Sequence, residues 1–416
     1  MCDGEWLNGP FGLDSKRGQT FPTKRTVLVV VHSATPGIRL SDVWPLLGDD
    51  RRVQLVFTRP PGALMAAGTD RFLEQLGGVV LPWRQAVSTR FDLAVAASYG
   101  RLEQLHAPVL LLSHGIGFSK RTVRYDGLGP EAPLEVAGME RAGIVFHGHV
   151  IPSGIVVPTT HDRETLVRAV PESSAVAFVG GDLCYDRLAV SLRRRASYRR
   201  ALGVGGRKLV AVSSTWGAGS LLETRPDALA DIARQLPRDE YCLAAIVHPN
   251  AWSWHGPLQV RAWCAEAVRR GMILIDPEEG WRAVLAAADC LIGDHGSVTA
   301  YAAAIGVPVL FGVFPSAHIV PGSPVARLGE VAPRLGPGPL PGQVADMMST
   351  WQGEEIAPEI RRGVTDIAGQ SAGVIRRAMY RLMGLPEPLW APRTVPVPPP
   401  RIASLGPGEA GTGVAS

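Results

Sequence analysis

The sequence lacks the signatures of several protein classes. It has no GxxxxGK(S/T) loop and no GxGxxG after an apolar run, which argues against a P-loop ATPase and a nicotinamide enzyme. No apolar run reaches the roughly 20 residues that a membrane-spanning helix needs. There is no lysine-rich stripe and the net charge is only +4, so nucleic acid is not an expected partner.

Cysteine is scarce and follows no pattern. The five cysteines form no CxxC pair, and four of them lie in or beside apolar runs, so we expect buried free thiols in a reducing compartment. The N-terminal segment, residues 1–24, is polar and lacks the apolar core of a signal peptide. The sequence therefore predicts a cytoplasmic protein, and peripheral contact with the inner face of the membrane is left open.

What is present is a long alternation of short apolar runs and helical patterns. The chain has 416 residues, of which 46% are hydrophobic and 19% charged, values typical of a soluble globular protein with room for two domains. The first strand candidate, 26–31, is continuously apolar, as strands buried on both faces of a parallel sheet are. Further candidates are 53–58, 79–81, 93–97, 109–113, 144–146, 176–179, 208–213, 243–247, 272–275, 290–292 and 309–311.

These elements predict an α/β fold of two Rossmann-like domains that face each other across a cleft. An arginine-rich helix over 183–202 is expected to enter the second domain. The expected segments are a disordered leader (1–24), an N-terminal acceptor-side domain (25–190), a nucleotide-donor domain (191–355), a helix returning to the first domain (356–385) and a Pro-rich disordered tail (386–416).

The most informative stretch is Asp289–Thr299. A short apolar run ends there in the turn Asp294-His295-Gly296-Ser297, and a small-residue helix begins at Val298. Free backbone N–H groups and the helix dipole make such a start a ready anion site, most often for phosphate. The alternative is that Asp294 and Ser297 only cap the helix, and the loop alone leaves the two interpretations about equally supported.

Two histidines follow strands, one in each half of the chain. His114, followed by Gly115 and later by Lys120, comes directly after the run 109–113 and could act as a general base. His248 ends the second-half run 243–247 and could contact a donor diphosphate as a cation or hydrogen-bond donor. A single histidine before glycine is more simply explained by a hydrogen bond to a loop carbonyl, but one strand-end histidine in each half is less easily dismissed.

Two further groups of residues follow strands. Thr215 and Trp216 follow the run 208–213 and could receive a phosphate and line a base or sugar pocket, or only cap and pack a helix. His147 and His149 have a spacing that can chelate a metal, but no further ligands lie at a recognisable spacing. We therefore predict no metal and no cofactor.

Taken in order, the motifs resemble those of the CDP-glycerol glycerophosphotransferase family, the teichoic-acid polymerase-like enzymes with a GT-B fold. The resemblance runs from about Leu93 to Met383. The matching stretches are the His-Gly loop at 114–120, the linker entry at 181–188, the strand ending in Thr-Trp at 208–216, the His-Pro motif at 247–250 and the loop, helix and strand at 289–311. His295-Gly296 stands where the family has Tyr-Ser, no arginine precedes His248, and Thr215 lacks the preceding proline.

The resemblance implies a transferase that moves a glycerol-phosphate-like or sugar group from a nucleotide-diphosphate donor to a hydroxyl, on an acceptor that could be lipid-linked. By this resemblance His114 is the base, with Gly115 and Lys120 on the acceptor side. Catalytic His248 and the donor-side residues then hold the diphosphate; these are Thr215, Trp216, Asp294, His295, Gly296, Ser297 and Val298. A UDP-sugar glycosyltransferase or nucleotide-sugar 2-epimerase is the nearest alternative, and a GT-B scaffold without catalysis is the second. The oligomeric state is not predicted.

Overall fold

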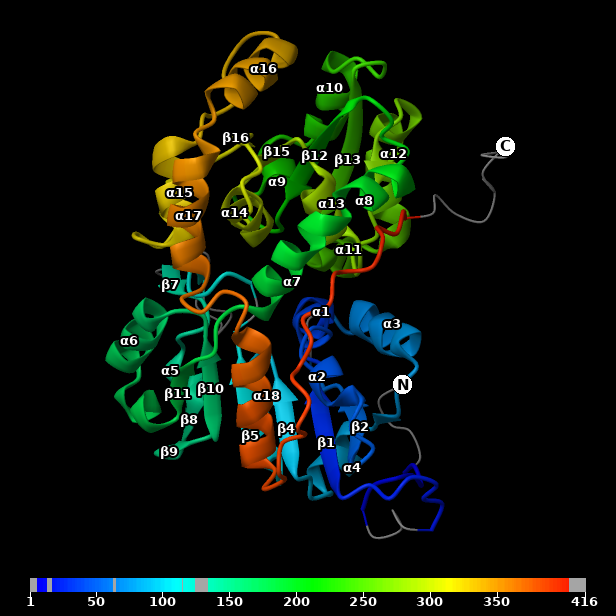
Figure 1. Ribbon diagram of the computed structural model, residues 1–416, viewed down its shortest axis with the longest axis vertical. Coiled ribbons are helices and arrows are strands. Elements are labelled where there is room, and N and C mark those ends of the chain that lie inside the picture. Colours follow the sequence, from blue (N-terminus) through cyan, green and yellow to red (C-terminus); the bar gives the residue numbers. More distant parts are fainter. Residues whose placement is uncertain (1–5, 13–16, 63–64, 114, 124–133, 404–416) are drawn as a thin grey trace.

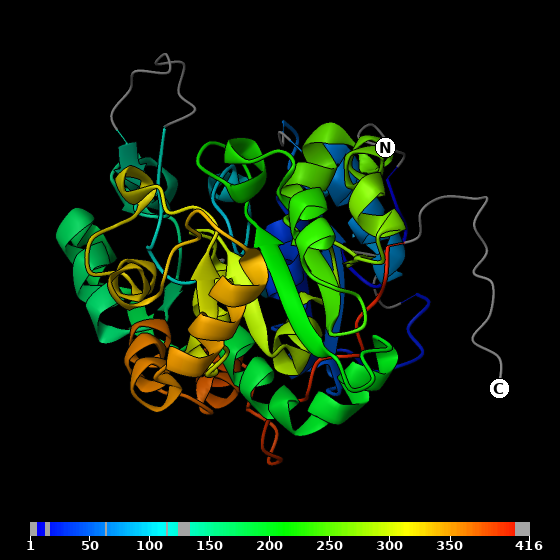
Figure 2. The same cartoon turned by 90° about the horizontal axis from the view of Figure 1, so that it is seen from above.

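The computed structural model describes residues 6–12, 17–62, 65–113, 115–123 and 134–403. Two α/β units, each built on a parallel sheet, are stacked along the long axis of the molecule (Figure 1). Figure 2 shows helices on both sides of the second sheet. No helix in the described ranges is long and apolar enough to cross a membrane.

The first sheet is parallel and has seven strands. In spatial order they are β11 (Ala177–Val179), β10 (Gly154–Val157), β5 (Val109–Leu112), β4 (Leu93–Ala96), β1 (Arg25–Val30), β2 (Val53–Thr58) and β3 (Val80–Leu81). Alternate residues of β1 enter different cores. Val27 and Val29 pack with α1 (Ala34–Leu40), α2 (Pro45–Gly48) and α18 (Ser371–Leu382), and Leu28 packs with α4 (Trp83–Val87) on the opposite face.

The second sheet has five parallel strands. Their spatial order is β14 (Ile273–Leu274), β13 (Tyr241–Val247), β12 (Lys208–Ser214), β15 (Cys290–Gly293) and β16 (Val309–Phe311). One face packs mainly on α7 (Leu183–Ser191), α8 (Arg195–Ala201), α13 (Trp281–Ala287), α14 (Ser297–Ala304), α15 (Pro324–Val331) and α17 (Gly353–Val364). The other packs on α9 (Leu221–Thr224), α10 (Ala228–Gln235), α11 (Pro249–His255), α12 (Pro257–Arg269) and α16 (Leu340–Thr350).

The remaining elements lie outside the two main sheets. They are α3 (Ala66–Leu76), α5 (Arg141–Ile144), α6 (Thr160–Ala169), the antiparallel pair β6 (Arg121–Val123) and β7 (Leu134–Val136), the antiparallel pair β8 (Val145–Phe146) and β9 (His149–Val150), and four short 3₁₀ turns. The four described cysteines, Cys184, Cys242, Cys264 and Cys290, are buried free thiols, as expected.

The first half differs from the predicted strands in two ways. The run 144–146 does form a strand, β8, but it pairs only with β9 in a small hairpin outside the main sheet. The strand that lies between β5 and β11 is instead β10, which the sequence pattern did not reveal. β10 is only four residues long and lies between Pro152 and Pro158, so it reads locally as a turn-rich stretch.

Two long predicted helices are interrupted. The helix over 183–202 breaks into α7 and α8, and Arg195 and Arg199 of α8 bind Asp289. The helix over 356–385 is two helices, because Thr365 takes an extended conformation after α17. α17 packs within the second domain, and α18 returns to the first, as predicted for the C-terminal helix.

The described parts of the two predicted disordered ends are packed, which corrects that expectation. Residues 386–403 form an extended strap, the red trace in Figure 1, that passes from α18 to the second domain. Val397 of the strap is fully buried, and its N–H donates to Ser191 Oγ at 2.9 Å. In the leader, Phe11 is buried and Leu7 exchanges two hydrogen bonds with Gln85. Proline lacks an N–H donor, so a Pro-rich strap can pack without leaving donors unsatisfied.

Candidate functional site in the interdomain cleft

The carboxyl ends of the two sheets meet at a cavity of about 100 Å³ between the domains. From the second domain it is lined by the starts of α11, α13 and α14 and by the end of β12; from the first, by α1 and by Gly115 in the loop after β5. Ligands of open α/β sheets bind at such strand ends. The cavity is the place where the predicted site residues can be located.

The start of α14 faces this cavity. Gly296 is the N-cap and makes no side-chain capping hydrogen bond, and Gly296, Ser297 and Val298 all line the cavity. A side chain at Gly296 would meet Thr215 Cβ at 3.1 Å, so glycine allows the two loops to approach closely. Uncapped N–H groups at a helix start favour an anion. This geometry fits the anion-site interpretation of the loop better than the capping one.

Asp294 does not line the cavity; it holds the loops around it. Its carboxylate is fully buried and accepts the N–H groups of Thr215 and Leu221 at 2.8 Å and of Gly296 at 3.0 Å. Burial raises the pKa of Asp294, and these hydrogen bonds act against that rise. Asp294 therefore positions the loops that border the cavity.

His295 is also placed behind the loop. It is 4% exposed, and neither ring nitrogen has a hydrogen-bond partner among the described residues. Burial, with the neighbouring Lys120 and His318, lowers the pKa of His295 to about 3. The ring is therefore neutral at ordinary pH, and it does not line the cavity.

His248 lines the cavity and caps α11. Its Nδ1 accepts the N–H of Asn250 at 3.1 Å, which leaves the proton of the neutral ring on Nε2. Trp216 lies beside it, with ring centroids 6.2 Å apart, but does not line the cavity.

The first domain contributes Gly115 and Lys120 from one loop. His114 lies outside the described residues. Gly115 has φ of +80°, lines the cavity, and a side chain there would approach Ser297 Oγ at 3.8 Å. Lys120 Nζ lies 3.4 Å from Thr215 Oγ1, so the predicted acceptor-side lysine reaches the donor-side loop. Burial lowers the pKa of Lys120, and the charge of Asp294 opposes this.

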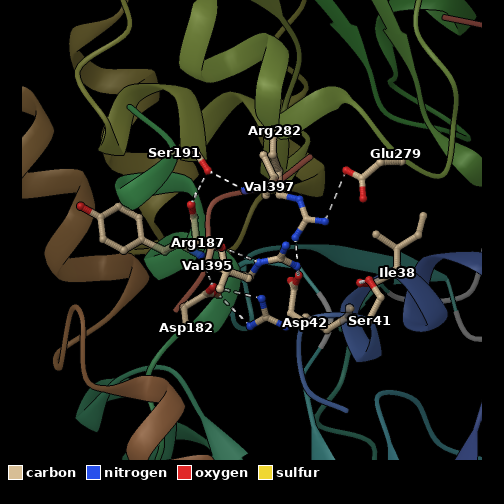
Figure 3. Close-up of polar contacts among 12 residues, drawn as sticks. Ile38, Ser41, Asp42, Asp182, Arg187, Ser191, Glu279, Arg282, Val395 and Val397 are labelled. Carbon is tan, nitrogen blue, oxygen red and sulfur yellow. Dashed lines mark hydrogen bonds and ion pairs between the residues drawn. The ribbon is translucent and has the colours of Figure 1, made fainter. Parts of the chain in front are cut away.

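No pattern in the sequence indicated the network of charges that joins the domains (Figure 3). Arg39 of α1 forms two 3.0 Å hydrogen bonds with Asp182, which also accepts Tyr301 Oη of α14 at 2.7 Å. Asp42 Oδ1 accepts both Arg187 of α7 and Arg282 of α13. Arg39, Asp42, Arg282 and Tyr301 all line the cavity. Among the described residues, no group of three His, Cys, Asp or Glu side chains is arranged to hold a metal ion.

Known structures match this architecture. The wall teichoic acid polymerase TagF aligns with a TM-score of 0.57 and 13% identity, over 89% of this chain and 92% of that one. A putative UDP-N-acetylglucosamine 2-epimerase from Listeria monocytogenes aligns with a TM-score of 0.54 and 15% identity, over 88% and 99%. The fold is GT-B-like. No protein-family model matches the chain, and no curated protein matches it by sequence. The expected fold is confirmed, and fold alone does not fix the reaction.

Proposed function

We propose that this GT-B-like protein is a metal-independent transferase that moves a glycerol-phosphate-like or sugar group from a nucleotide-diphosphate donor to an acceptor hydroxyl. The observation that carries the proposal is the uncapped start of α14, which opens on a cavity closed by the first domain. In this proposal the N–H groups at Gly296–Val298 bind the diphosphate. They stabilise the charge that develops on the leaving nucleotide.

The side chains around the cavity divide the remaining roles. His248 donates from Nε2 to a phosphate oxygen, Ser297 adds a hydroxyl, and Thr215 stands beside Lys120 at the same edge. We assign the removal of the acceptor proton to His114, which directly precedes the cavity-lining Gly115 in the sequence. Holding donor and acceptor between two domains supplies the orientation that group transfer needs.

The donor must enter by opening the cleft. The cavity of about 100 Å³ is smaller than the roughly 300–1,000 Å³ typical of ligand pockets. The described contacts that close it join α1 and α3 to α11, as in the 2.9 Å hydrogen bond from Thr35 Oγ1 to Asn250. A cycle of opening and closing around a fixed α14 site follows from the proposal.

A scaffold that binds a nucleotide without catalysis is the second candidate. It is favoured by His295, which is buried and neutral where the resembling family has tyrosine. In this candidate the start of α14 still binds the nucleotide, but no residue acts as a general base.

Binding and product release separate the candidates. We expect CDP-glycerol, CDP-ribitol or a UDP-sugar to raise the melting temperature, because a ligand at 100 times its Kd adds about 2.7 kcal/mol to stability. Release of CMP with an acceptor then indicates glycerol-phosphate transfer, and release of UDP indicates glycosyl transfer. Binding without release indicates the scaffold. If no nucleotide stabilises the protein, glycerol-phosphate transfer, glycosyl transfer and the nucleotide-binding scaffold are all refuted.

A further inference from the structure

Arg282 is a buried guanidinium with unused hydrogen-bond donors. It is 1% exposed and donates from Nη1 to Asp42 Oδ1 at 2.5 Å. Its Nε and Nη2 have no hydrogen-bond partner among the described residues. Buried polar groups are nearly always paired, so two unpaired donors on one cation point to a missing partner.

The neighbouring cations do not share this deficit. Arg39 is paired with Asp182 through two hydrogen bonds. Arg187 pairs with Asp42 and also donates to the carbonyl of Val395 at 3.1 Å. Figure 3 draws the 3.7 Å ion pair between Arg282 Nη2 and Glu279, but neither Nη2 nor Nε makes a hydrogen bond to a described residue.

The two unpaired atoms have a defined geometry. The N–H groups of Nε and Nη2 point in parallel from one edge of the guanidinium and bind two oxygens of one carboxylate or phosphate side by side. Glu279 lies beside Nη2, but its Oε1 is 3.7 Å away, too far for a hydrogen bond. The same Glu279 oxygen already accepts the N–H of Gly280 at 3.1 Å.

Arg282 shares its cavity with the start of α14. Trp281, its neighbour in the chain, packs against Tyr301 of α14 with ring centroids 5.7 Å apart. Arg282, Tyr301 and Ser297 line one continuous space. Nε and Nη2 are buried in this closed form, so an oxyanion reaches them when the cleft opens and then lies in the same space as the start of α14.

We propose that Arg282 forms a second oxyanion subsite at the inner end of the cleft, which binds a phosphate or carboxylate. Assigning that oxyanion to the transferred group or to the acceptor rests on the proposed function; its binding at Arg282 does not. The proposal adds a substrate class, in which one of the two substrates carries an acidic group beyond the diphosphate.

Calorimetric titration of the full chain with inorganic phosphate at constant ionic strength tests the subsite. Arg282→Lys keeps the charge but loses the parallel N–H pair, so we expect affinity to fall about 10-fold or more. Glu279→Gln removes a repelling carboxylate and should raise affinity by roughly 2- to 5-fold. Arg327→Lys changes an arginine paired with Glu359 outside the cavity and is the matched control, with no expected change. Melting curves establish that each variant is folded.

Three results would overturn the subsite: no saturable phosphate binding, equal affinity in Arg282→Lys and the unchanged protein, or loss of binding only in Ser297→Ala. Whether the donor or the acceptor carries this oxyanion is tested with pairs of compounds, one charged and one neutral. UDP-glucuronate is compared with UDP-glucose for the donor, and glycerol 3-phosphate with glycerol for the acceptor. A preference for the charged member that disappears in Arg282→Lys identifies the source; no preference in either pair refutes the substrate assignment. Phosphate binding that persists without any transfer activity separates failure of the proposed function from failure of the subsite.

Discussion

The two walls of the cleft present their polar groups in opposite ways. The second-domain wall offers backbone N–H groups at the start of α14 and the ring of His248, held by buried Asp294. The first-domain wall offers charged side chains that already bind across the domain boundary, as Asp42 binds Arg282. The helix start lacks a side-chain cap, whereas the paired charges of the first-domain wall hold the domains together. We therefore expect ligand binding mainly at the second-domain wall and closure of the cleft mainly through the first-domain wall.

The largest expected effect concerns a residue of the first-domain loop. We predict that His114→Ala lowers the rate of transfer by roughly 100- to 10,000-fold, the range for loss of a positioned general base. Donor affinity should barely change, because the donor is bound by the opposite wall. Single-turnover rates with donor and acceptor saturating, measured across pH, check this. Near-normal turnover in the variant would remove His114 from the mechanism.

The next effect tests whether the paired charges provide closure. Asp182→Ala leaves Arg39 buried without its partner and removes the cap of α7, so we expect the free energy of unfolding to fall by about 3–5 kcal/mol. Asp182→Asn keeps a capping oxygen and should lose less. Denaturant unfolding measures both.

An exposed ion pair is the control for Asp182. Glu359 pairs with Arg327 at the surface, where such a pair is worth about 0–1 kcal/mol. If Glu359→Ala destabilises the protein as much as Asp182→Ala does, the interdomain network has no special role in closure.

A smaller effect is expected where the domains touch beside the cleft. A Cβ at Gly68 of α3 would lie 2.0 Å from Ser253 Oγ of α11 and 2.8 Å from its Cβ. Gly68→Ala should cost about 1–3 kcal/mol from overpacking, less about 1 kcal/mol gained by alanine in a helix. Adding Ser253→Gly should recover part of the loss.

Gly373 of α18 is the matched control for Gly68. A Cβ there meets nothing closer than Pro392 at 4.0 Å, so Gly373→Ala should be neutral or stabilising by up to about 1 kcal/mol. Thermal unfolding of the two alanine variants measures the difference. If both alanine variants change the melting temperature equally, the contact between α3 and α11 adjusts easily to an added methyl group.

The smallest effect lies on the second-domain wall. Ser297→Ala should weaken donor binding by roughly 0.5–1.5 kcal/mol, because one neutral hydrogen bond is lost while the backbone N–H groups remain. Gly296→Val should weaken it more, since a side chain there meets Thr215 at 3.1 Å and obstructs the approach of a phosphate. Calorimetry with the true donor checks both, and unchanged affinity in both variants would exclude α14 as the diphosphate site.

Much of the fold could be predicted from the sequence. Buried parallel strands are continuous apolar runs, so 53–58 and 309–311 were placed with the bounds of β2 and β16. The sequence also placed a helix start just after the turn at Asp294–Ser297, but it left open whether these residues cap the helix or an anion binds there. These features depend on residues close in the chain, where periodicity and composition report burial directly.

Tertiary structure decided which polar groups are free. His295 and Asp294 lie in the same turn as Gly296, yet packing against Lys120 and Thr215 turns them away from the cavity. Arg282 and Asp42 are 240 residues apart, and nothing near either one predicts their contact. The packing of the strap at 386–403 was also not predicted, because its Pro-rich composition indicated disorder.

The sequence by itself determined most strands of the two sheets, their order along the chain and the loops that reach the cleft. Only the tertiary structure decided which side chains line the cavity, which charges are paired and which guanidinium is left with unused donors. The physical reason is that strand and helix patterns arise from neighbouring residues. Hydrogen-bond satisfaction of a buried charge depends instead on groups that meet only when the domains pack.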